Sequence, residues 1–229
     1  MTVKPHFNAV VCWLLSALMT LAMPMPLLAE DNDSSVQKRL ERGEVVVGLK
    51  DVGATKYVTA QVLINAPPDQ VWPIMVNPFE FQGKISPRMK MVEVVADQSN
   101  RSVLKFTVDA ILIPHFTYTV ESLYGSNNNS QSIQFHRVDG MLKDFRGSWV
   151  MTPVASGGKT ELTYCMYVDP GFPVPQWMIR EAVKHELPKT LTALRKRVEI
   201  TSQKPFVKEK RTILAAFMHI PHPKLYETK

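Results

Sequence analysis

The feature that most constrains the fold is a succession of short alternating segments that precedes one long amphipathic segment. Six segments between Met89 and Val168 alternate apolar and polar residues, a pattern typical of half-buried strands. Turn-forming residues separate them, and such short connections imply antiparallel neighbours. The predicted strands are Met89–Asp97, Ser102–Ile113, Phe116–Tyr124, Ser132–Val138, Phe145–Thr152 and Glu161–Val168.

The segment after these strands predicts a long helix. From Val174 to Glu199, apolar residues recur at three- and four-residue spacing, which indicates one continuous apolar face. Pro188 lies inside it, and because proline removes a backbone hydrogen bond we expect a bend there. An earlier alternating segment, Tyr57–Asn65, predicts another strand, followed by two short helices. The expected fold is therefore α+β, with a curved antiparallel sheet of about seven strands around the C-terminal helix.

The N-terminus has the pattern of a secretory signal peptide. Lys4 precedes an apolar run from Ala9 to Met23, and Ala29 stands just before an acidic, polar stretch. The run is shorter than the ~20 apolar residues of a transmembrane helix. We therefore expect cleavage after Ala29, with Ala22 as a second site, and export to a periplasm or to the exterior. An uncleaved N-terminal anchor is the alternative.

The remaining chain suits one domain with a sizeable core. We expect a lead-in with a short helix at residues 30–56, a ligand-binding domain at 57–199 and a basic extension at 200–229. Cys165 is the only cysteine that would remain after cleavage, so no internal disulfide can form. Its place in an alternating segment is typical of a small buried apolar residue.

The positive charge gathers at the C-terminal end. The net charge is +6, and from Lys184 to Lys229 the chain carries eleven Lys or Arg and four Asp or Glu. Basic ends favour anionic surfaces, and export makes nucleic acid an unsuitable partner. The candidate partner is an anionic membrane, although a solvated helix face would explain the same charges. The residues expected to contact it are Lys204, Lys208, Lys210 and Arg211.

Three sets of residues carry a family resemblance. The first is the strand that runs into a helix over residues 62–72, the second joins Gly147-Ser148-Trp149 and Pro153 to residues 160–164, and the third is Leu187-Pro188 with residues 191–198. In these residues the chain resembles the START-like (SRPBCC) superfamily, in particular its polyketide cyclase/dehydrase and coenzyme Q-binding START branch. The resemblance covers about residues 58–198. It implies a helix-grip fold whose cavity holds a lipid, sterol, isoprenoid quinone or polyketide-like ligand.

Aromatic and methionine side chains on the predicted inward faces are the candidates for the cavity lining. Pockets for small molecules are mostly apolar with a few polar groups, and methionine adapts its shape to irregular ligands. Each of these residues alone would also fit a packed core, and the resemblance favours the cavity. Tyr164 is the best polar candidate. The predicted lining is Phe106, Tyr118, Phe135, Trp149, Met151, Tyr164, Met166, Ile179, Val183 and Leu187.

The sequence contains no familiar catalytic motif, such as HExxH, GxSxG, a P-loop or a dinucleotide fingerprint. Glu181 and His185 share the polar side of the predicted helix, as exposed residues do, and His219 and His222 lack a third metal ligand.

Asp109 and Arg146 could pair at a strand end.

Because the catalytic and metal-binding signals are poor, we expect a protein that binds or carries a hydrophobic small molecule, with no catalytic residue, metal or cofactor. A cyclase or dehydratase acting on a polyketide-like or other apolar substrate is the alternative.

Overall fold

The structure is a computed structural model that describes residues 30–109, 116–127 and 129–203. Its contacts divide the chain into residues 1–35 and residues 36–229. The described part of the first unit is the start of helix α1 (Glu30–Glu41). The sheet and the later helices belong to the second unit. The predicted signal peptide lies outside the described residues. So do His219, His222 and the proposed membrane contacts Lys204, Lys208, Lys210 and Arg211.

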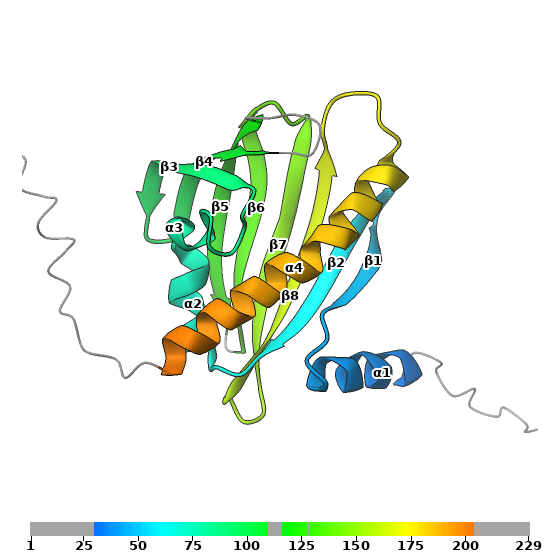
Figure 1. Cartoon of the computed structure of the whole chain (residues 1–229), viewed down its shortest axis with the longest axis vertical. Helices are drawn as coiled ribbons and strands as arrows, with labels where there is room; N and C mark the ends of the chain where they lie inside the picture. The colour runs from blue at the N-terminus through cyan, green and yellow to red at the C-terminus, as the bar shows by residue number, and fades with distance from the viewer. Residues whose placement is uncertain (1–29, 110–115, 128, 204–229) are drawn as a thin grey trace, which may run out of the picture. The chain divides into compact units, whose positions relative to one another are not determined.

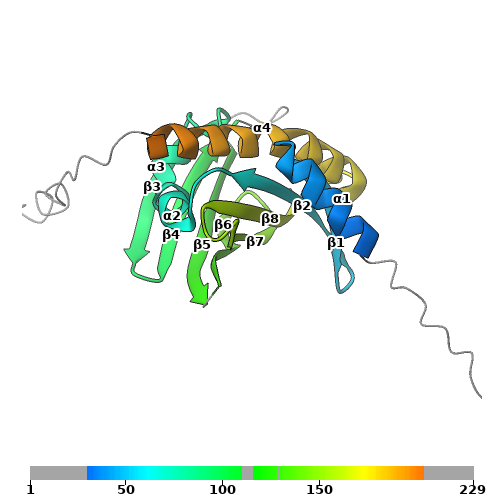
Figure 2. The ribbon, with the colours of Figure 1, turned by 90° about the horizontal axis from the view of Figure 1, so that it is seen from below.

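Eight strands form one antiparallel sheet in the order β1-β2-β8-β7-β6-β5-β4-β3. The strand near the start of the domain, β2, pairs with the last one, β8. Figure 2 shows the sheet curving beneath helix α4. The strands are β1 (Val46–Val52), β2 (Thr55–Ile64), β3 (Met89–Gln98), β4 (Arg101–Val108), β5 (Phe116–Asn127), β6 (Ser130–Gly140), β7 (Asp144–Val154) and β8 (Lys159–Asp169).

Strand β1 was not predicted, and it raises the strand count from about seven to eight. It forms one edge of the sheet and joins β2 through a tight turn at Gly53, which has a positive φ of 58°. Four of its seven residues are exposed and Val46 alone is buried, so the apolar alternation that identifies a strand is weak.

Helix α1 lies within the predicted lead-in and begins at Glu30. One predicted bound was wrong. Strand β4 ends at Val108, five residues before the predicted end. Gly43 ends α1, because its φ of 80° lets the amides of Gly43 and Glu44 donate to the carbonyls of Leu40 and Arg39.

The long helix predicted after the strands is α4 (Gln176–Gln203), which crosses the concave face of the sheet (Figure 1). The second half of its apolar stripe is buried, through Leu187, Leu191, Leu194 and Val198. These side chains join the main core with Val58, Ala60, Val62 and Ile64, which share one face of β2. The helix continues unbroken through Pro188, the position of the expected bend. In the described part of the chain, no helix is both long and apolar enough to cross a bilayer.

Two short helices, α2 (Pro68–Val76) and α3 (Pro78–Phe81), follow β2 as predicted. Proline at the first turn suits both starts because its missing N–H would have no helical partner. The buried hydroxyl of Thr160 donates to the Ala66 carbonyl at 2.7 Å, which fastens the β2–α2 connection to β8. Val71, Ile74 and Met75 of α2 then complete the core between the sheet and α4.

Polar contacts fasten the C-terminal half of α4. Arg197 donates to both carboxylate oxygens of Glu80 in α3, at 2.5 and 3.0 Å. Glu199 accepts from the backbone and side-chain amides of Asn65, each at 3.0 Å, and Arg195 donates to the Gly43 carbonyl at 2.8 Å. Arg195 and Arg197, two basic residues of this half of α4, therefore help to hold the helix against the rest of the domain.

Candidate ligand-binding cavity

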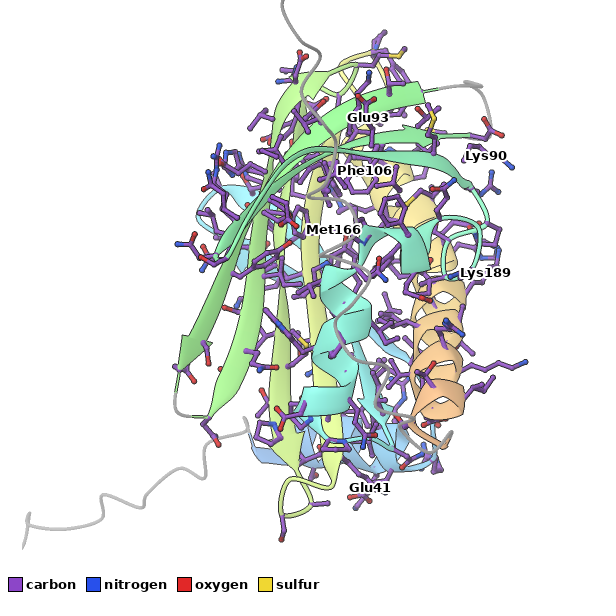
Figure 3. The ribbon with its side chains drawn as sticks, turned by 90° about the vertical axis from the view of Figure 1, so that its left-hand side faces the viewer. Glu41, Lys90, Glu93, Phe106, Met166 and Lys189 are labelled. Carbon is purple, nitrogen blue, oxygen red and sulfur yellow. The ribbon has the colours of Figure 1, made fainter. Side chains whose placement is uncertain are left out.

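A cavity of about 490 Å³ lies between the concave face of the sheet and the helices α2, α3 and α4. This volume falls within the roughly 300–1,000 Å³ of small-molecule sites. Figure 3 shows Phe106 of β4 and Met166 of β8 in the space between the sheet and α4. The helices and the α3–β3 connection contribute Met75, Val76, Pro78, Phe81, Ser86, Ile179, Leu187 and Thr190. The strands and their ends contribute Met89, Leu104, Phe106, Val108, Phe116, Tyr118, Val120, Ser122, Tyr124, Ile133, Phe135, Leu142, Phe145, Trp149, Tyr164, Met166, Val168, Pro170 and Phe172.

Aromatic rings form a continuous layer across the sheet wall of the cavity. The ring of Tyr118 contacts those of Phe106 and Phe145, with centroids 5.5 and 5.4 Å apart. Phe145 contacts Phe135 at 5.0 Å, and Phe135 contacts Tyr164 at 5.9 Å. Tyr164 stacks on Trp149 with a centroid distance of 3.6 Å and an interplanar angle of 11°. Mutual contact of this kind fixes the ring positions, so the wall is formed in advance of any ligand.

Gly147 allows this layer to pack. It follows Phe145 and precedes Trp149 on the inward face of β7. A Cβ at this position would lie 2.1 Å from the Cys165 carbonyl oxygen and 2.7 Å from the Phe135 ring. Only a residue without a side chain lets β7 approach β8 and lets the Phe135 ring lie over the strand.

The polar groups of the described lining are all uncharged. They are the hydroxyls of Ser86, Tyr118, Ser122, Tyr124, Tyr164 and Thr190 and the indole of Trp149. Burial raises the pKa of Tyr118 to about 12. Burial, and then the neighbouring Tyr118, raises the pKa of Tyr164. Both phenols therefore remain protonated at neutral pH and can donate hydrogen bonds.

Eight of the ten predicted lining residues line the cavity, and whether they contact a ligand remains a prediction. They are Phe106, Tyr118, Phe135, Trp149, Tyr164, Met166, Ile179 and Leu187. Met151 is fully buried in the core and is not among the lining residues, because alternation identifies the face of a strand but not the depth along it. Val183 lies instead beside a much smaller hollow that Lys56, Tyr167 and Arg180 also line.

Sequence reasoning missed the contribution of α2 and α3, which comes from Met75, Val76, Pro78 and Phe81. No local pattern reveals these residues as lining, because the packing of both helices over the sheet depends on contacts distant in sequence. Phe145 and Tyr124 were also missed. Their alternation with predicted inward residues, Trp149 in β7 and Tyr118 in β5, could have identified them.

The other polar candidates lie away from the cavity lining. Arg146 bonds the hydroxyl of Tyr57 at 2.7 Å and the carboxylate of Asp144 at 2.6 Å, so its predicted pairing with Asp109 was wrong.

Asp109 lies instead 3.5 Å from Lys90. Glu181 is exposed and pairs with Lys184, in agreement with the predicted surface role. Cys165 is half-buried, and burial raises the pKa of its thiol. Among the described residues, no cluster of His, Cys, Asp and Glu could hold a metal ion.

Comparison with known families adds one match. The family described as polyketide cyclase / dehydrase and lipid transport matches residues 56–199, which is most of the described chain. This range includes all strands of the sheet except β1 and nearly the whole of α4. No curated protein sequence matches the chain.

Solved structures show the same fold at low sequence identity. A STAR-related lipid transfer protein from Xanthomonas axonopodis is 19% identical with a TM-score of 0.58, covering 68% of this chain and 93% of that one. The Zhui aromatase/cyclase from Streptomyces sp. R1128 is 18% identical with a TM-score of 0.55, covering 65% and 96%. Human StAR-related lipid transfer protein 5 is 12% identical with a TM-score of 0.57, covering 75% and 94%. At these identities the likeness concerns the fold, which hosts both transfer proteins and enzymes.

Proposed function

Because this chain belongs to the polyketide cyclase/dehydrase and lipid transport family, we propose that it binds a hydrophobic small molecule in the cavity and carries it unchanged. One observation carries the proposal. The cavity is large and aromatic, and its described lining contains no carboxylate, imidazole, thiol, amine or guanidinium group.

The described lining offers no suitable group for proton transfer. A general acid or base works best when its pKa lies near the pH at which the enzyme operates. The tyrosines of the lining have pKa values raised away from neutrality by burial, so they hold their protons and form hydrogen bonds. The family also includes cyclases, and chemical conversion of the bound molecule is therefore the rival outcome that the experiment must detect.

The proposal extends to where the protein acts. The apolar run after Lys4 and the boundary at Ala29 support export, with removal of residues 1–29 and a periplasmic or secreted location. The basic residues Lys204, Lys208, Lys210 and Arg211 support loading or unloading at an anionic membrane. A hydrophobic ligand dissolves in membranes, so a carrier that exchanges it there needs contact with that surface.

The test is native mass spectrometry of protein purified from the cell envelope of its own host, with N-terminal sequencing of the same sample. We expect a first residue close to Glu30 and a bound small molecule that organic extraction releases. Two variants on neighbouring positions of β5 provide the control. Ser122→Trp places a large ring in the cavity and should empty it, whereas Leu123→Trp, at an exposed position of the same strand, should retain the ligand.

The result can contradict each part separately. Folded wild-type protein without any bound molecule, or equal occupancy in both tryptophan variants, would contradict binding in this cavity. Conversion of the extracted molecule on incubation with fresh protein would show catalysis and replace the carrier with the cyclase alternative. A mature N-terminus at Met1 or Thr2 would contradict cleavage.

A further inference from the structure

Two tyrosines whose rings pack against aromatic neighbours line the cavity. Tyr118 comes from β5, and its ring contacts Phe106, Phe116 and Phe145 at centroid distances of 5.4 to 5.8 Å. Tyr164 comes from β8 and is held by stacking on Trp149. Because aromatic neighbours restrict both rings, their hydroxyls have defined positions on the cavity wall.

The hydroxyls of the lining differ in their partners. The Tyr124 hydroxyl lies 2.7 Å from the Ser102 hydroxyl, and the Thr190 hydroxyl donates to the Glu186 carbonyl at 3.4 Å. Within the part of the chain that the structure describes, the hydroxyls of Tyr118 and Tyr164 have no such partner. Neither hydroxyl is among the enclosed polar atoms that lack a partner in the described chain, so both are accessible from the cavity, and an oxygen of a bound molecule can accept a hydrogen bond from each.

Charge sets a second condition on the ligand. No described lining residue carries a formal charge, so a carboxylate, phosphate or ammonium group deep in the cavity would lose its water without gaining an ion-pair partner. An uncharged oxygen such as a carbonyl accepts two hydrogen bonds through its two lone pairs. Tyr118 and Tyr164 each present one phenol donor to the cavity.

We propose that Tyr118 and Tyr164 donate hydrogen bonds to uncharged oxygen of the ligand, so that the cavity selects neutral hydrophobic molecules that carry a carbonyl or hydroxyl group. This inference rests on the proposed function, because it assigns specificity to the same cavity. It narrows the ligand class to molecules with a polar, uncharged end among otherwise apolar atoms. It also assigns both tyrosines to recognition.

Three probes of one shape separate the effects. Fluorene is a hydrocarbon, 9-fluorenone carries a carbonyl in place of its methylene group, and fluorene-9-carboxylate carries a charge. Equilibrium dialysis of each probe against the purified protein gives its dissociation constant. We expect 9-fluorenone to bind about tenfold more tightly than fluorene, the ratio that one net hydrogen bond supplies. Fluorene-9-carboxylate should bind more weakly than either.

Variants test the assignment to these residues. In Tyr118→Phe/Tyr164→Phe, fluorene binding should be unchanged and the preference for 9-fluorenone should disappear. Tyr167→Phe is the matched control, because Tyr167 lies on the opposite face of β8 and contacts Tyr57. It should retain the preference, and melting temperatures verify that each variant is folded. Equal affinity of wild type for fluorene and 9-fluorenone, or a preference that survives in the double variant, would overturn the inference while leaving the proposed function intact. Failure of all three probes to bind would contradict the proposed function itself.

Discussion

At the scale of single residues, the cavity wall depends on a position that has no side chain. The aromatic layer extends from Phe106 to Trp149, and Gly147 lies beneath its centre, under the Phe135 ring. The neighbouring backbone atoms of Cys165 and Met166 leave no room for a Cβ there. Side chains of a packed core shift only at a cost in free energy, and backbone atoms of a paired strand shift even less readily.

Gly147→Ala should therefore destabilise the protein. The added methyl group would force β7 away from β8 or displace the Phe135 ring, and overpacking of this kind costs about 1–3 kcal/mol. Urea unfolding followed by circular dichroism measures the change in the free energy of unfolding. Gly158→Ala is the control, since a Cβ at Gly158 would meet only the Ala155 carbonyl at 3.5 Å. An equal effect in the two variants would exclude close packing as the reason for Gly147.

At the scale of elements, an ion pair between Glu80 and Arg197 joins α3 to α4. The Glu80 side chain is 11% exposed and that of Arg197 is 35% exposed. The hydrogen bonds from Arg197 are the main cause of a lowered pKa at Glu80, which opposes the effect of its burial. Phe81, the neighbour of Glu80, lines the cavity, and the centroids of its ring and the Trp149 ring are 6.4 Å apart. The ion pair thus holds α3, which carries the lining residue Phe81, against α4.

Arg197→Ala should lower stability by about 1–3 kcal/mol, because it leaves a largely buried carboxylate without its main partner. Arg197→Lys should retain only part of the stability, because lysine keeps the positive charge but cannot form the bidentate contact with Glu80. The pH dependence has a definite sign. The folded pKa of Glu80 lies below its unfolded value, so the stabilisation is present above pH 4.5 and is lost as the pH falls through the folded pKa.

Unfolding of wild type and Arg197→Ala at pH 7 and at pH 3 measures both effects. The difference between the two proteins should be smaller at pH 3. Arg195→Ala removes only a bond to the exposed Gly43 carbonyl and should change stability less. A difference that stays constant with pH would contradict the role of the Glu80 charge.

Helix α4 contains Pro188, next to the lining residue Leu187. Proline cannot bond the carbonyl of Lys184, so the helix is weakest beside the cavity. Pro188→Ala should keep the fold and change the rate of ligand release, while an isolated α4 peptide should gain up to ~3 kcal/mol of helix stability. Stopped-flow dissociation of 9-fluorenone compares the two proteins, and equal release rates would contradict a role of Pro188 in exchange.

At the scale of the whole molecule, the basic C-terminal residues predict attraction to anionic membranes. Each Lys or Arg near such a surface contributes about 1 kcal/mol, which salt screens. Full-length protein should sediment with vesicles of phosphatidylglycerol and phosphatidylcholine at low salt, and less as salt rises.

Deletion of residues 204–229 should reduce this binding and leave ligand affinity unchanged. Vesicles of phosphatidylcholine alone provide the uncharged control. If neither protein sediments and the deletion only lowers the melting temperature, the tail belongs to the fold and the membrane proposal is wrong.

The sequence by itself determined the order of elements, the inward face of each main strand and the apolar stripe of α4. Period-two alternation and helical spacing are local properties, and residues such as Val62 and Leu191 follow them into the core. The same patterns, together with the family resemblance, selected eight residues that line the cavity, including both tyrosines. Strand β1 was not identified because four of its seven residues are exposed, which leaves its apolar alternation weak.

Only the tertiary structure decided where the core ends and the cavity begins. Met151 and Trp149 lie on the same face of β7, yet Met151 is packed in the core while Trp149 lines the cavity. That difference depends on how α2, α3 and α4 cover the sheet along its length. The partners of Glu80, Arg146 and Asn65 are likewise residues far along the chain, brought together by the fold. Alternation fixes the direction of a side chain, whereas depth and partners arise from contacts distant in sequence.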